Sequence, residues 1–133
     1  MLVPCEVSIK CILPAVRALV AKELMTKYEL KQVEAAKLLG VSQPAVSLYY
    51  RQMRGKAIDL ENDAEIMNLI ENLTALLSKG EPSHKDFIPM FCEICRTIRA
   101  KGLMCKLHKA FDPAIDIEKC ELCSIIASGC VNK

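Results

Sequence analysis

The chain has 133 residues, which is room for one compact domain or two small helical modules but not for a large catalytic scaffold with its own cofactor fold. Hydrophobic residues make up 52% and charged residues 26%, a balance that excludes an intrinsically disordered chain. The net charge of +2 is uneven, because residues 1–56 carry nine Lys or Arg against four Glu whereas residues 57–83 carry one Lys against six acids. The basic first part suits a polyanionic partner.

The first half of the chain shows helical periodicity. Apolar residues recur every three or four positions over residues 13–28, and Pro14 suits the first turn of such a helix. A second helix is predicted over residues 31–39, with Gly40 as its left-handed cap. Ser42 is a typical N-cap for a third helix that runs to about residue 53, with Pro44 in its first turn.

The second half begins with a long amphipathic helix over residues 60–78. Its apolar stripe runs from Ile66 to Leu77, and its acids lie early in the helix, where the macrodipole favours anions. The breaker run at residues 79–84 predicts a module boundary. Further helices are predicted over residues 86–100 and 117–127, with a break at Gly102 and a turn at residues 112–113.

Residues 32–51 have the residue types of a helix-turn-helix at the required spacing. Ala36 is small where two helices must cross closely, and Gly40 lies where the turn needs a positive φ. Val41, Val46 and Tyr49 fall on the inward side of the second helix. A two-helix corner with a merely solvated outer face is the alternative.

The outward face of the second helix matches what a recognition helix offers to the major groove. Gln43 suits a bidentate pair of hydrogen bonds with adenine, and Arg51 suits guanine. We therefore predict an interface with a double-stranded DNA operator. The residues expected to contact it are Ser42, Gln43, Pro44, Ser47, Tyr50, Arg51 and Arg54.

The first 55 residues also resemble a known family. The stretches that carry the resemblance are residues 4–6 (PCE), 13–19 (LPAVRAL), 32–41 (QVEAAKLLGV) and 43–47 (QPAVS). They resemble the Cro/repressor-type (XRE-like) helix-turn-helix regulators of archaea and are particularly similar to the DNA-binding part of archaeal thiamine-biosynthesis regulators. The 133 residues do not include the ligand domain of those regulators, so thiamine sensing is not carried over. The resemblance implies a transcriptional regulator that binds as a dimer.

Six of the eight cysteines lie in the last 42 residues, and most of them are closely paired. Residues three apart on a helix are neighbours, so each C-x-x-C pair can supply two corners of one tetrahedral site. Buried free thiols are the alternative. We predict a metal site, with candidate ligands Cys92, Cys95, Cys105, Cys120 and Cys123; Cys130 and His108 are further possibilities, although a partly exposed, non-ligating His108 is expected.

Two features of the sequence bear on the identity of the metal. The number of thiols and the apolar residues around the first pair favour a [4Fe-4S] cluster, with Zn²⁺ as the alternative. Cys5 and Cys11 are six residues apart, which is not one helical face, so ordinary packing is expected for both.

The sequence as a whole predicts an all-α protein with a helix-turn-helix module (residues 1–58), a long amphipathic helix (residues 59–80) that dimerises or packs internally, and a small helical cysteine-rich metal module (residues 81–133). We expect a cytoplasmic homodimeric DNA-binding regulator without a membrane segment, whose operator affinity responds to redox, iron or sulfur status. It is expected not to be an enzyme. The alternatives are the same regulator with a structural zinc site and, less favoured, a C-x-x-C thiol oxidoreductase.

Overall fold

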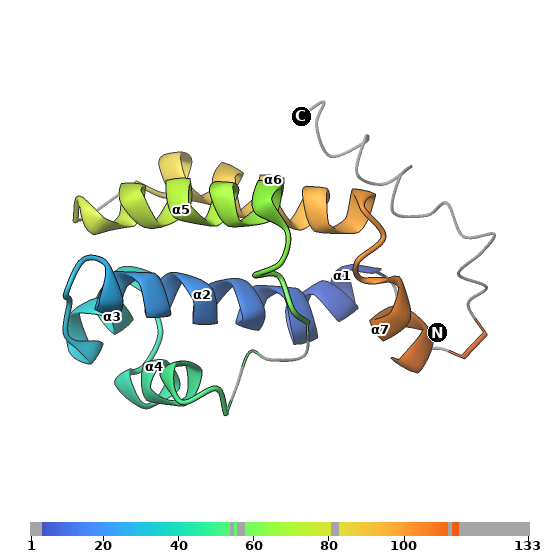
Figure 1. The fold of residues 1–133 in the computed structure, drawn as a ribbon, viewed down its shortest axis with the longest axis horizontal. Coiled ribbons are helices and arrows are strands. Elements are labelled where there is room, and N and C mark those ends of the chain that lie inside the picture. Colours follow the sequence, from blue (N-terminus) through green and yellow to red (C-terminus); the bar gives the residue numbers. More distant parts are fainter. Residues whose placement is uncertain (1–3, 54, 56–57, 81–82, 112, 115–133) are drawn as a thin grey trace.

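The computed structural model describes residues 4–53, 55, 58–80, 83–111 and 113–114, and every regular element within them is a helix (Figure 1). The all-α prediction is confirmed for this part of the chain. None of these helices is both long and apolar enough to cross a bilayer. The elements are α1 (Pro4–Val7), the π-helix η1 (Ser8–Ile12), α2 (Leu13–Thr26), α3 (Gln32–Leu39), α4 (Gln43–Tyr50), α5 (Ala64–Ser78), α6 (His84–Ala100) and α7 (Cys105–Phe111).

The first three elements form one continuous helical segment with a widened turn in the middle. In that turn the N–H of Leu13 bonds the carbonyl of Ser8, five residues back. Pro14, directly after the turn, has no N–H to offer the carbonyl of Lys10. The sequence therefore predicted α2 well, but the helical backbone begins earlier, at Pro4 instead of residue 13.

A tight turn at Gly40 joins α3 and α4, and residues 32–50 are called the α3–α4 corner below. Gly40 has φ +68°, and the N–H of Val41 bonds the carbonyl of Ala36 at 3.0 Å, which closes the end of α3 as a glycine cap does. The hydroxyl of Ser42 accepts from the N–H of Ala45 at 3.2 Å and caps α4, as predicted. The helix ends at Tyr50, before the predicted residue 53.

The helix α5 starts at Ala64 instead of residue 60, because Asp63 is its N-cap and accepts from the N–H of Ile66 at 3.1 Å. The preceding residues form a turn in which the carboxylate of Asp59 accepts from the N–H of Glu61. After residue 83, α6 returns beside α5, and α5 in turn packs on α2 (Figure 1).

The apolar stripe of α5 is covered by other helices of the same chain. Its residues Ile66, Ile70, Leu73 and Leu77 are at most 1% exposed, because the helix packs against α2 on one side and α6 on the other. The sequence left two roles open for this stripe, a dimer contact and an internal core. In the structure the stripe is part of the internal core. The buried residues run from Val7 to Met104 in one cluster, so all three predicted segments contribute to a shared core.

Candidate nucleic-acid interface

The helix α4 is held in place by one apolar face. Ala45, Val46 and Tyr49 are 7%, 0% and 3% exposed, and α4 packs on α2 and α3. The inward orientation predicted for Val46 and Tyr49 is confirmed. Because this face is fixed, the opposite face of α4 has a defined orientation on the surface of the molecule.

That opposite face carries the residues predicted to touch DNA. Gln43 and Pro44 are exposed in the first turn, Tyr50 is 49% exposed in the last, and Arg51 follows the helix in an exposed position. Ser47, between them, is half-buried. Ser42 is exposed but uses its hydroxyl oxygen as the helix cap, and Arg54 lies outside the described residues.

One polar contact orients Gln43. Its side-chain amide donates a hydrogen bond to the side-chain oxygen of Gln32, the first residue of α3. The contact leaves the Gln43 carbonyl oxygen and one N–H of the same amide for another partner. The sequence carries no signal for this role of Gln32, since a glutamine at the start of a helix has no distinguishing pattern.

Exposed cations surround the α3–α4 corner. Lys31 directly precedes α3, Lys37 lies in its last turn, and Arg51 follows α4. Over residues 31–53 the sequence contains a single carboxylate, Glu34, and it accepts from the backbone N–H of Lys31 at 3.1 Å. The side chains facing solvent here are therefore mostly neutral or positive, which suits a polyanionic surface.

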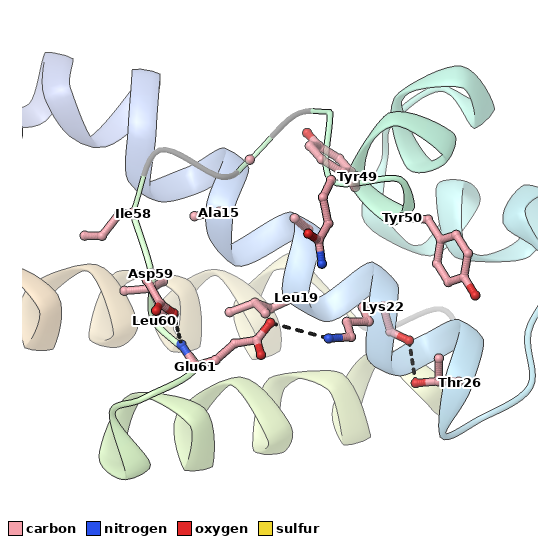
Figure 2. A pocket seen from close by; sticks show the side chains of 13 residues that line it. Ala15, Leu19, Lys22, Thr26, Tyr49, Tyr50, Ile58, Asp59, Leu60 and Glu61 are labelled. Carbon is pink, nitrogen blue, oxygen red and sulfur yellow. Dashed lines mark hydrogen bonds and ion pairs between the residues drawn. The ribbon is translucent and has the colours of Figure 1, made fainter.

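A hollow of about 500 Å³ lies behind the end of α4. Tyr49 and Tyr50 of α4 line it together with Leu19 of α2 and residues 58–61, and the Lys22 ammonium contacts the Glu61 carboxylate across it at 3.4 Å (Figure 2). The sequence carries no signal for this hollow, because its walls come from α2 and from residues 49–61, which lie more than 20 positions further along the chain.

The predicted metal ligands are only partly within the described residues. Cys92 (exposed) and Cys95 (half-buried) lie one turn apart on α6, and Cys105 (half-buried) is the first residue of α7. Cys120 and Cys123, like Cys130, lie outside the described residues. Among the side chains that are described, no three of the His, Cys, Asp and Glu type gather as a metal site needs.

His108 and Cys11, for which the sequence also makes predictions, are both buried. His108 is 3% exposed, so the expectation of a partly exposed histidine was wrong; α7, where it lies, packs against the start of the chain, which no local pattern predicts. Cys11 is 4% exposed, as ordinary packing implies, and burial raises the pKa of its thiol although Lys10 acts in the opposite direction.

Comparisons of the chain with protein-family models, with curated proteins and with solved structures found no match.

Proposed function

We propose that the chain is a DNA-binding transcriptional regulator in which α3 and α4 act as a helix-turn-helix and α4 enters the major groove. The observation that carries the proposal is that α4 has one buried and one exposed face. Its residues Val46 and Tyr49 are buried against the rest of the protein, while Gln43 at its start and Arg51 directly after its end are exposed to solvent. A recognition helix needs both sides, one to fix its position and one to read the duplex.

The polar groups of α4 have separate roles in this proposal. The Gln43 carbonyl oxygen and its remaining N–H match the N6 donor and N7 acceptor of adenine, and the bond to Gln32 holds the amide in place. Arg51 offers a fork of donors to guanine or to a phosphate. The exposed Lys31 and Lys37 are suited to phosphates, which position a protein on the duplex without reading its sequence.

The proposal extends to the partner and the family. A two-fold symmetric operator is read by a symmetric dimer, so a homodimer is the proposed DNA-bound form. Because the α5 stripe is buried within the chain, the dimer contact would use another surface. The resemblance of residues 4–47 to Cro/repressor-type regulators supports the same proposal.

The test starts from DNA selected by the full chain from a random duplex pool, since the operator is unknown. Affinity for the selected duplex is then measured by fluorescence anisotropy for the wild type and for Gln43→Ala with Arg51→Ala. Each side chain that reads a base should contribute about 1 to 3 kcal/mol. The double variant should therefore bind the selected duplex at least about fivefold more weakly if one of the two side chains reads a base, and at least about thirtyfold more weakly if both do.

The matched control is Asn72→Ala with Lys79→Ala, which also removes one amide and one cation from exposed positions but lies on and after α5. This control should keep wild-type affinity. A double variant in α4 that binds as tightly as the control pair would show that α4 is not the reading helix.

The metal part of the sequence prediction remains a proposal within this function. In the described chain Cys92 and Cys95 offer two thiols one helical turn apart, and a four-ligand site would need two more from among Cys105, Cys120 and Cys123. A bound [4Fe-4S] cluster would make DNA affinity sensitive to redox or iron supply, whereas Zn²⁺ would only support the fold.

Metal and sulfide analysis after anaerobic purification separates these forms. Iron and sulfide in equal amounts with brown colour support the cluster, and stoichiometric zinc in a colourless protein supports the alternative. If neither metal copurifies and Cys92→Ser with Cys95→Ser leaves DNA binding unchanged under oxidising and reducing conditions, the metal proposal fails while the DNA-binding proposal stands.

A further inference from the structure

An apolar groove of about 380 Å³ is bordered by the first helical segment and α6. Ile9 and Ile88 in its lining are 63% and 45% exposed, so the groove is open to solvent. This volume is within the range of about 300 to 1,000 Å³ that small-molecule sites show. Its apolar lining residues are Ile9, Leu13, Leu39, Phe87, Ile88 and Phe91.

The charged side chains among the described lining residues of the groove are two arginines. Arg17 of α2 and Arg99 of α6 line it, and the described lining contains no carboxylate. Arg99 is only 6% exposed, so its guanidinium lies where water screens its charge poorly. A guanidinium carries five N–H donors in a planar fork, which suits the two oxygens of a carboxylate.

Internal contacts join several side chains that line the groove. The rings of Phe87 and Phe91 meet edge to face with centroids 6.4 Å apart. Ser8, 5% exposed, accepts from the Cys95 thiol at 3.5 Å and donates to the Met104 sulfur at 3.4 Å. Ser8 also belongs to the π-helical turn, a feature that occurs often at binding sites.

We propose that this groove binds a small amphiphilic anion, namely an apolar chain or ring that carries one carboxylate. The apolar part lies along Ile88, Phe87 and Phe91, and the carboxylate bonds the guanidinium groups of Arg17 and Arg99. The argument for this occupant is charge complementarity: an apolar groove with two cations and no described anion favours an anionic ligand over a neutral or cationic one of the same shape. The proposal does not depend on DNA binding.

The experiment is a calorimetric titration of the full chain with dodecanoate below its micelle concentration. Dodecyltrimethylammonium has the same chain with the opposite charge and is the matched ligand. We expect saturable one-to-one binding of dodecanoate, and binding at least about tenfold weaker for the cation, because charge-assisted hydrogen bonds are worth that factor or more. Equal affinity for the two amphiphiles, or no saturable binding of dodecanoate, would overturn the proposal.

Variants locate the binding to the groove. Ile88 is exposed, so Ile88→Glu and Ile88→Lys leave the core unchanged; the first should weaken dodecanoate binding at least about tenfold and the second should not. Arg99→Met should also weaken it, whereas Arg96→Met, one turn earlier on α6 and outside the lining, should not. Identical dodecanoate affinities for Ile88→Glu, Ile88→Lys and wild type would contradict the assignment.

Two other occupants of the groove are outcomes of the same experiment. Cys92 and Cys95 also line the groove, so a metal on these thiols is one rival. If the protein carries stoichiometric metal, and removing it with a chelator does not produce dodecanoate binding, the amphiphile proposal is wrong. A second copy of the chain is the other rival. A dimer in sedimentation equilibrium that Ile88→Lys converts to monomer, without any dodecanoate binding, would assign the groove to that contact instead.

Discussion

Two glycines with positive φ differ in what surrounds them. A Cβ at Gly40 would meet no atom within 4 Å, whereas a Cβ at Gly55 would lie 2.5 Å from the Pro14 carbonyl oxygen and 2.8 Å from the Ala18 Cβ. The sequence indicates Gly40 as a helix cap, and Gly55 follows the end of the third predicted helix. Only the structure shows that Gly55 also lets the chain after α4 approach α2 closely.

This difference predicts unequal effects of alanine. Gly40→Ala should lower the free energy of unfolding by about 1 to 2 kcal/mol, the ordinary cost of left-handed backbone for a residue with a Cβ. Gly55→Ala should lower it further, because the clash with α2 adds to the same backbone cost. Urea denaturation followed by circular dichroism measures both, and equal losses would mean that the contact at Gly55 is absent.

Glu23 is a second residue whose surroundings only the fold explains. Burial between α2 and α5 raises the pKa of its carboxyl group, Glu71 raises it further, and Lys27 lowers it less. The Thr74 side chain, whose hydroxyl also donates to the Ile70 carbonyl at 2.8 Å, lowers this pKa by less than Lys27 does. A carboxyl group with a raised pKa in the folded state binds its proton more tightly there than in the unfolded chain.

Stability should therefore fall as the pH rises from the ordinary glutamate value of 4.5 through the folded-state pKa of Glu23. Glu23→Gln removes the ionisation, so the variant should melt at a higher temperature than wild type at pH 7, and the two should converge below pH 4.5. Glu93→Gln, at an exposed position on α6, is the control and should not change this pH dependence. A Glu23→Gln variant that is less stable than wild type at pH 7 would contradict the assignment.

At the scale of elements, one ionic contact fastens the end of α6 to the start of α5. The Lys101 ammonium lies 3.0 Å from both Asp63 oxygens and 2.7 Å from a Glu65 oxygen. Hydrogen bonding from Lys101, and then from the Ile66 N–H, lowers the pKa of the Asp63 carboxyl group. A lowered pKa means that this contribution to stability is present above the ordinary aspartate value of 3.8 and is lost as the pH falls through the folded-state value.

Lys101→Met should raise the pKa of Asp63 towards its ordinary value without restoring it fully, because the bond from the Ile66 N–H remains. Carboxyl-detected NMR titration measures this pKa directly. Lys79→Met, which removes another lysine that follows a helix, should leave it unchanged. An unchanged Asp63 pKa in Lys101→Met would show that the two helix ends are not joined in solution.

The elements were the most predictable part of the structure. Periodicity and caps placed α3 and α4 closely, because Ser42 and Gly40 act through local hydrogen bonds and φ. The start of the first helical segment was missed, since Pro14 in a first turn and Pro14 after a widened turn have the same local sequence. Amphipathicity showed that the stripe of α5 is buried, but not what covers it.

At the scale of the whole molecule, segments with separate predicted roles share one core. Val16, Ile70 and Ile98 come from the three predicted segments and are buried in the same cluster. The helices α6, α5, α2 and α4 are therefore in contact one after the other. A structural change in α6 can reach α4 through these contacts. Long-range placements of this kind, including the groove with Arg17 and Arg99, join residues more than 80 positions apart and leave no local sequence signal.

The central claim is that the exposed side of α4 binds duplex DNA. Amide chemical-shift mapping of the ¹⁵N-labelled full chain during titration with the selected duplex tests it most directly. The account predicts that the largest shifts fall on residues 42–51 and on the start of α3, while the amides on the solvent side of α5 and α6 hardly move. Shifts concentrated on α5 or α6, or no shifts at a saturating concentration of the duplex, would contradict it.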